Sequence, residues 1–399
     1  MRSILTRLLG AAAAAALLGT APLMGTAPIV SAQPTFPGAD PDVFHVAPPD
    51  LGAHANGDVL GVRPVDVSRY GNADGWQILF RSTNSSGAPI AATTTLMVPR
   101  GGVDRPLVSY QAIINSLGTR CAPSHSLFDG QFTEAPAIGP ILLRGWAVAI
   151  PDHLGPNSAY GAARLGGQIA LDGIRAVQRL PEARVGHSAV GLVGYSGGGM
   201  ATGWAAALAP TYAPELPIVG VAQGGVPTNL NEMAAGLGLA PHPLFGLAFA
   251  ATLGLEREYP TRIAVSPFLT PTGAALRDRI VDGCSEDIID NGAGHSTAEV
   301  TSEPGRILEP PMRTVFDENS LISYPGAPRA PVFAWHGSGD QLAPLASTAA
   351  TMSHWCASGT RVLLNVLPGD HGPASIAGIP GVFGYLGDRF AGIPAPSNC

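Results

Sequence analysis

Short apolar runs recur along this 399-residue chain, and their spacing restricts the fold more than any other feature of the sequence. Most of them are rich in Val, Ile and Ala, as is typical of strands buried on both faces of a parallel sheet. The runs are Trp76–Ser82, Ile90–Val98, Leu107–Ile113, Trp146–Ile150, Ala189–Val193, Ile218–Ala222, Pro331–Trp335 and Val362–Val366. Helical patterns lie between several of them, at Tyr160–Leu180, Met200–Leu208 and Ala343–Cys356. The alternation predicts an α/β fold with a doubly wound, mostly parallel sheet.

The alternation stops between about Val226 and Ser323, where Pro, Gly and short apolar helices such as Leu244–Leu255 replace it. We therefore expect a helical cap, residues 227–322, inserted into a core formed by residues 33–226 and 323–399. Residues 33–75 are rich in Pro, Gly and Asp and are predicted to be irregular.

The first 32 residues have the pattern of an export signal. Arg2 and Arg7 precede an uncharged apolar run, and small residues lead to an expected cut between Ala32 and Gln33. The run is too short for a spanning helix, and no later segment could cross a membrane. We expect a secreted protein, extracellular or associated with the cell envelope. The net charge of −7 and the absence of a basic run exclude nucleic acid as an expected partner.

The sequence Gly194-Tyr195-Ser196-Gly197-Gly198 matches the Gly-x-Ser-x-Gly nucleophile turn. In this motif the serine lies on a sharp turn between a strand and a helix, so its neighbours must lack bulky side chains. A chain with 51 glycines produces the pattern easily by chance. The predicted buried strand before it and the predicted helix after it make Ser196 a strong candidate nucleophile.

A serine nucleophile needs a base and an acid that orients the base, in the chain order Ser, acid, His. Asp340 follows one predicted strand and His371 follows the last, and reactive groups collect at such strand ends. Asp370 is a weaker candidate acid because side chains of adjacent residues generally diverge. His336 precedes Asp340 and is better explained as structural.

Stabilisation of a tetrahedral intermediate requires hydrogen-bond donors to its oxyanion. The backbone N–H of Gly197 is the first expected donor. Asn115, in the loop after the Leu107–Ile113 run, is the candidate for the second, and a turn-capping role explains it equally well.

Four cysteines, Cys121, Cys284, Cys356 and Cys399, lie outside the export segment. In an oxidising compartment an even count indicates two disulfides, with three possible pairings. Neither a Cys-x-x-Cys nor a His-x-x-x-His pattern is present, so no zinc site is expected. The nucleophile–base mechanism needs no cofactor and no metal.

Together these motifs resemble the secretory lipase family, which includes the yeast-type lipase A enzymes. Besides the Ser196 motif, the resemblance rests on Cys121–Ser124, Pro151–His153, Leu171–Arg175, Tyr212–Leu216 and the Trp335–Asp340 strand end. It covers most of the chain after the export segment. It implies an α/β-hydrolase core with a cap, a triad of Ser196, Asp340 and His371, and disulfides Cys121–Cys284 and Cys356–Cys399. The family can have Asp at the second oxyanion position, where this chain has Asn115.

The expected function is hydrolysis of carboxylic acyl esters, such as triacylglycerols, through an acyl-enzyme. Phe245, Leu247 and Phe249 could line an acyl tunnel, although they could equally form the core of the cap. Acyl transfer to another acceptor is the main alternative, and product analysis with an alcohol acceptor distinguishes it. A non-catalytic binding module is the other, and the triad in its proper order argues against it.

Overall fold

A nine-stranded sheet is the frame of the structure, a computed structural model that describes residues 33–399. The predicted export signal, residues 1–32, lies outside the described residues. The strand order is β1-β2-β3-β5-β4-β6-β7-β8-β9. Strands β1, β2, β3 and β5 pair antiparallel, and all pairs from β5 to β9 are parallel. The strands are β1 (Val59–Pro64), β2 (Ala73–Thr83), β3 (Pro89–Pro99), β4 (Leu107–Gln111), β5 (Ala147–Pro151), β6 (Val190–Tyr195), β7 (Ile218–Gly224), β8 (Val332–Gly337) and β9 (Val362–Leu367).

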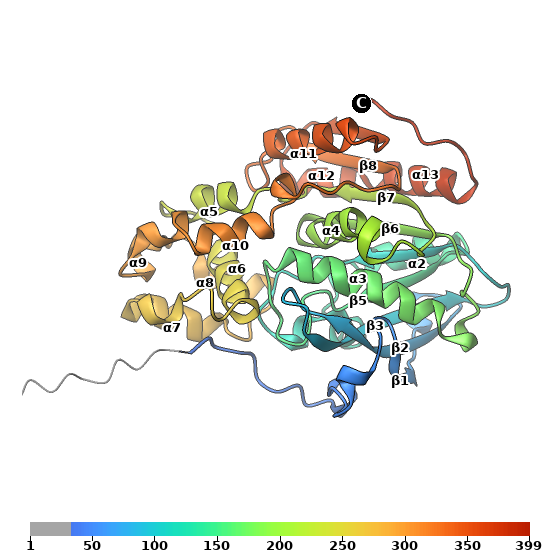
Figure 1. The fold of residues 1–399 in the computed structure, drawn as a ribbon, viewed down its shortest axis with the longest axis horizontal. Helices are drawn as coiled ribbons and strands as arrows, with labels where there is room; N and C mark the ends of the chain where they lie inside the picture. Colours follow the sequence, from blue (N-terminus) through green and yellow to red (C-terminus); the bar gives the residue numbers. More distant parts are fainter. Residues whose placement is uncertain (1–32) are drawn as a thin grey trace, which may run out of the picture. The chain divides into compact units, whose positions relative to one another are not determined.

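Helices cover both faces of the sheet, so the core has two apolar layers (Figure 1). The helices of one face are α3 (Ala163–Gln178), α4 (Ser196–Tyr212) and α11 (Leu345–Ala357), and those of the other are α1 (Pro123–Asp129), α2 (Ala135–Leu143) and α13 (Ile379–Phe390). Within β6, Leu192 belongs to the first layer and Val193 to the second, because side chains alternate along a strand. The predicted doubly wound, mostly parallel sheet is confirmed.

The prediction that residues 33–75 are irregular is wrong for one strand. This segment contains β1, which pairs with β2 at the edge of the sheet. Its side chains are only partly buried or exposed, and it contains Gly61, Arg63 and Pro64. An edge strand of this kind carries little apolar periodicity, so its sequence gives almost no strand signal.

Between β7 and β8 the chain forms a group of helices, which we call the inserted segment (residues 227–322; yellow-green to orange in Figure 1). It contains α5 (Leu230–Gly238), α6 (Phe245–Glu258), α7 (Pro271–Ile280), α8 (Ser285–Gly292), α9 (Thr297–Val300) and α10 (Met312–Glu318). Its apolar side chains, among them Phe245 and Ile288, are continuous with the layer that α3 and α4 form on the sheet.

The inserted segment is attached to the loop after β4 by covalent and hydrogen bonds. A disulfide joins Cys121 to Cys284, and the backbone N–H groups of Leu117 and Gly118 both donate to Gly283 O, at 3.0 and 3.3 Å. Gly118 lies so close to Asp282 that a Cβ on it would approach the Asp282 carbonyl oxygen to 2.3 Å. The loop and the inserted segment are therefore packed backbone against backbone.

Arg257, on α6, connects the same two regions. The residue is only 3% exposed, so its charged guanidinium is buried. It donates to backbone carbonyls rather than to a carboxylate, and burial lowers its pKa to about 10. The acceptors are Thr35, Leu117, Asn157, Ser158 and Val281. One side chain thus holds four separate stretches of chain together.

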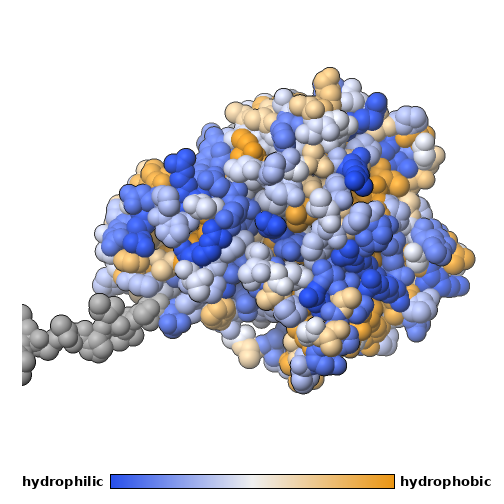
Figure 2. All heavy atoms as spheres, viewed as in Figure 1, coloured by the Kyte–Doolittle hydropathy of each residue, from blue (hydrophilic) through white to orange (hydrophobic). Residues whose placement is uncertain are grey.

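The second disulfide joins Cys356, on α11, to Cys399. The backbone N–H of Asn398 donates to Val362 O at 2.9 Å, so the last described residues run beside β9. Among residues 33–399 no helix is long and apolar enough to span a membrane. On the face drawn in Figure 2, hydrophilic residues predominate and apolar ones are scattered among them.

Candidate active site

The predicted catalytic and oxyanion residues follow the carboxyl ends of four parallel strands. Asn115 follows β4, Ser196 follows β6, Asp340 follows β8 and His371 follows β9. Strands β4 and β6 are neighbours, as are β8 and β9, and β7 lies between the two pairs. Residues separated by up to 256 positions in sequence are thereby brought to one edge (371 − 115 = 256).

Ser196 is the first residue of α4 and directly follows β6. Its φ is 52°, in the left-handed region that residues with a Cβ rarely adopt. The turn is possible because its flanking glycines are closely packed. A Cβ on Gly194 would approach Gly198 O to 2.5 Å, and a Cβ on Gly198 would approach Gln111 O to 2.0 Å. These contacts explain why the motif requires glycine at both positions.

Ser196, His371 and Asp340 form a continuous chain of hydrogen bonds. His371 Nε2 lies 2.8 Å from Ser196 Oγ, and His371 Nδ1 lies 2.6 Å from Asp340 Oδ2. With the proton on Nδ1, the imidazole donates to the carboxylate and accepts from the serine hydroxyl. The arrangement can remove a proton from Ser196 Oγ and return it to a leaving group.

Asp340 is held rigidly by its own surroundings. Its Oδ1 accepts from the backbone N–H groups of Leu342 and Ala343, at 3.0 and 2.8 Å. His336, fully buried, lies with Nε2 2.6 Å from Ala343 O and 3.4 Å from Asp340 Oδ2. Burial lowers the pKa of His336, so this ring is neutral and leaves the negative charge of Asp340 to His371.

Asn115 and Gly197 are in direct contact beside the nucleophile. A Cβ on Gly197 would approach Asn115 Oδ1 to 2.1 Å, so the amide group of Asn115 lies over the backbone of Gly197. Asn115 has a φ of 38°, and its Oδ1 is buried without a hydrogen-bond partner among the described residues. The backbone N–H of Gly197 is in the first turn of α4, where helices leave N–H groups unpaired. A developing oxyanion could be stabilised here.

The loop that carries Asn115 is fixed by buried groups which the sequence analysis did not single out. His153 lies with Nε2 2.9 Å from Ala112 O, and burial lowers its pKa to about 4. Glu134 accepts from the Ile113 backbone N–H and from the Tyr110 hydroxyl, and burial raises its pKa. The sequence alone cannot reveal that His153 and Glu134 fix this loop, because their hydrogen-bond partners are identified only by the fold.

The competing candidates lie elsewhere or make other contacts. Asp370 is exposed at the N-cap of α12 (His371–Ala377). Two other histidines have partners of their own: His295 lies 2.8 Å from Glu299, and His354 lies 3.3 Å from Pro325 O.

The three predicted acyl-tunnel residues lie on two faces of α6. Phe245 and Phe249 stack with ring centroids 5.8 Å apart and line an apolar pocket within the inserted segment. Leu247 shares the other face with Ala251 and Gly254, one and two turns along the helix. Gly161 and Tyr160 pack directly against those two residues. All three predicted residues are buried.

The sequence profile of the secretory lipases matches residues 130–398. The chain is similar to a secreted triacylglycerol lipase of Malassezia globosa, with 31% identity over 90% of this chain and 81% of that protein. It is 32% identical to lipase 5 of Candida albicans, over 92% of this chain and 83% of that protein. Among solved structures, closed-state Candida antarctica lipase A matches with a TM-score of 0.83 and 27% identity, over 90% of this chain and 89% of that one.

Proposed function

The chain belongs to the secretory lipase family and is a secreted carboxylic ester hydrolase of the α/β-hydrolase fold, and from this premise we propose that it cleaves triacylglycerols and related acyl esters with Ser196 as its nucleophile. The observation that carries the proposal is the hydrogen-bonded chain Ser196–His371–Asp340. The curated relatives named as secreted triacylglycerol lipases support the substrate class.

In the proposed reaction, Ser196 Oγ attacks the ester carbonyl carbon while His371 Nε2 takes the serine proton. Asp340 stabilises the imidazolium without itself accepting the proton. The carbonyl oxygen becomes an oxyanion, to which Gly197 N–H and Asn115 donate hydrogen bonds. Collapse of the intermediate breaks the bond to the alcohol oxygen, which His371 protonates.

The second half of the reaction releases the fatty acid. Water enters, His371 Nε2 takes one of its protons, and the resulting hydroxide attacks the acyl-Ser196 carbonyl. The second tetrahedral intermediate collapses, and His371 returns the proton to Ser196 Oγ. His371 therefore carries out every proton transfer in the proposed cycle.

We further propose that residues 227–322 act as a cap over this site and that Phe245 and Phe249 contribute to acyl recognition, with the buried Leu247 packing the other face of α6. The position of the inserted segment between β7 and β8, after the nucleophile and before the acid, supports this assignment. The apolar pocket beside Phe245 and Phe249 offers an environment that favours an acyl chain over water.

The test uses the protein that begins at Gln33, with p-nitrophenyl esters of increasing acyl length and an emulsified triacylglycerol as substrates. A fluorophosphonate probe should label Ser196, as located by mass spectrometry. Ser196→Ala should lower kcat by about 10⁴-fold or more. Ser338→Ala, which removes an exposed hydroxyl two residues before Asp340, is the matched control and should keep full activity. Labelling of a different serine, or activity retained in Ser196→Ala, would refute the nucleophile assignment.

A further inference from the structure

A pocket of about 230 Å³ lies apart from the Ser196 site, behind the loop that carries Asn115. Its walls come from the N-terminal segment (residues 36–45), from β3, from α1 and from the loop after β5. Neither Ser196 nor His371 nor Asp340 lines it. Ile114 and Thr119 do, so one wall belongs to the same loop as Asn115.

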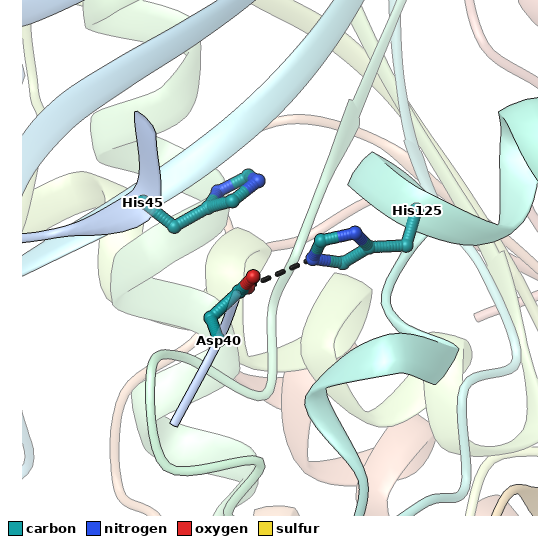
Figure 3. Close-up of side chains that lie close together, drawn as sticks. All are labelled: Asp40, His45 and His125. Atoms are coloured by element: carbon teal, nitrogen blue, oxygen red, sulfur yellow. Dashed lines mark hydrogen bonds and ion pairs between the residues drawn. The ribbon is translucent and has the colours of Figure 1, made fainter. Parts of the chain in front are cut away.

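Three side chains with metal-binding atoms meet in this pocket: Asp40, His45 and His125. One nitrogen or oxygen atom from each lies within 4.8 Å of the other two. Figure 3 shows the two imidazoles and the carboxylate directed toward one another. Asp40 and His45 belong to the N-terminal segment and His125 to α1, so the group forms only in the folded chain.

The two ring nitrogens of His45 have different surroundings. Nδ1 lies 2.9 Å from Thr93 Oγ1, whereas Nε2 is buried and has no hydrogen-bond partner among residues 33–399. A buried polar atom without a hydrogen-bond partner is energetically unfavourable, so its presence calls for an explanation. When Nδ1–H donates to Thr93 Oγ1, Nε2 carries a free lone pair. In metal sites, a neighbouring oxygen commonly fixes the tautomer of a ligating histidine in this way.

The other two groups are already in contact. His125 Nε2 lies 2.8 Å from Asp40 Oδ2. Ligands at about 2.0–2.2 Å from a tetrahedral zinc ion are about 3.3 Å apart, so small side-chain rotations would open this pair around an ion. Two imidazole nitrogens with one carboxylate oxygen favour zinc and similar transition metals over calcium or magnesium, which prefer oxygen ligands.

The charges around the pocket suit a divalent cation. Asp152 lies in the same wall and interacts electrostatically with both imidazoles. Asp42 is also near His45, with Oδ2 3.7 Å from Nε2, but its charge is offset by Arg63. Neither Asp40 nor Asp152 pairs with an arginine among the described residues, so both carboxyl groups are available to balance the charge of a divalent ion.

We propose that Asp40, His45 and His125 bind one divalent transition-metal ion, of which zinc fits best, with water completing a tetrahedral site. The ion would have a structural role. It would tie the N-terminal segment to α1, beside the pocket wall that Ile114 provides. The proposal is independent of the catalytic assignment, because it concerns no residue that takes part in the reaction.

The experiment measures metal binding directly on the chain that begins at Gln33, after removal of metal with a chelator. Zinc content after loading and desalting should be about one ion per chain, and zinc should raise the melting temperature by several degrees. Cobalt should give the visible absorption of a tetrahedral Co²⁺ site. His45→Gln and His125→Gln should each weaken zinc binding about tenfold or more.

His54→Gln is the matched control, because His54 also lies between two carboxylates, Asp50 and Asp58, but at a more exposed position. This variant should bind zinc as the unaltered chain does. The proposal is overturned if the chain binds no zinc, if His45→Gln and His125→Gln bind it unchanged, or if His54→Gln loses binding to the same degree. Equal stabilisation by calcium or magnesium would also overturn it.

Discussion

Ser196 combines a reactive side chain with an unfavourable backbone conformation. A left-handed φ at a residue with a Cβ is unfavourable by about 1–3 kcal/mol and persists only where surrounding packing enforces it. Here the enforcement comes from Gly194 and Gly198, whose backbones touch their neighbours with no room for side chains. The same geometry directs Oγ out of the helix toward His371.

Replacement of the acid tests the order of the catalytic groups. Asp340→Asn should lower kcat/KM by about 10³–10⁴-fold, because the amide no longer holds His371 in the productive tautomer or stabilises its charged form. Asp370→Asn should change activity less than about threefold, since Asp370 is exposed and His371 hydrogen-bonds to Asp340 instead. Steady-state kinetics on one ester decide the matter, and a greater loss in Asp370→Asn would mean that the acid is misassigned.

Substitution of Asn115 distinguishes between its side-chain amide and its backbone N–H as the donor to the oxyanion. Asn115→Gly keeps the left-handed backbone and its N–H but removes the amide group. If the amide is the donor, kcat should fall by about 10²–10³-fold while the melting temperature changes little. Asn115→Asp, of equal size, should lose activity as the pH rises and its carboxyl ionises, because only the protonated carboxyl can donate. Nearly full activity in Asn115→Gly would instead assign the donation to the backbone N–H.

At the scale of helices and strands, the buried sheet could be predicted because its apolar runs are continuous and its turns are rich in Gly and Pro. Every predicted strand from Trp76–Ser82 to Val362–Val366 has a counterpart in the sheet. The sequence does not reveal β1 or the short helices of the inserted segment, such as α8 and α9, because their pairing and packing partners are distant in sequence. Local pattern carries no information about such contacts.

Helix α6 allows a test of acyl recognition with two comparable truncations. Phe249→Ala enlarges the apolar pocket in the inserted segment and should raise the ratio of long-chain to short-chain kcat/KM. Each further buried methylene contributes about 0.8 kcal/mol, roughly fourfold. The measurement is the p-nitrophenyl ester series with each variant.

Leu247→Ala is the control on the opposite face of α6, the face on which Ala251 and Gly254 pack against Gly161 and Tyr160. Both truncations should lower the melting temperature, since both side chains are buried. Only Phe249→Ala should change the chain-length ratio by a large factor. An equal change in both variants, or in neither, would show that the pocket beside Phe249 does not select the acyl chain.

At the scale of the whole molecule, the free energy of unfolding should depend on pH through His153. Its folded-state pKa is lowered to about 4, so between pH 6.5 and 4 the unfolded chain binds the extra proton and the folded chain does not. Stability should therefore fall as the pH is lowered through this window, by about 3 kcal/mol from this group. Glu134 and Asp172, whose pKa values burial raises, act in the opposite direction at acid pH.

The His153 contribution is isolated by comparison with His153→Gln, whose amide can still donate to Ala112 O. Denaturant unfolding at several pH values from 7 to 4 should show a smaller loss of stability in the variant than in the unaltered chain. Identical pH dependence in the two proteins would contradict the assignment of a neutral, buried imidazole.

The sequence pointed to Ser196, Asp340 and His371 because each follows a recognisable strand, and the structure brings the three into hydrogen-bond contact. Other groups left no such signal. Arg257 acts through five backbone carbonyls, and carbonyls leave no mark in a sequence. The absence of closely spaced Cys or His pairs argued against a metal site. Asp40 and His125 are 85 positions apart, so their proximity depends on how the N-terminal segment folds back onto α1.

The attachment of the inserted segment to the Asn115 loop determines how the enzyme can open. The amides of Leu117 and Gly118 should exchange their hydrogens with solvent only when Gly283 releases them, so their protection reports detachment of the inserted segment. Any such detachment also breaks the Arg257 contact with Leu117 and frees the loop that positions Asn115. If Asn115 donates to the oxyanion as proposed, a molecule opened in this way would be inactive. A substrate would then reach Ser196 by local rearrangement at the rim rather than by a hinged swing of all the helices together.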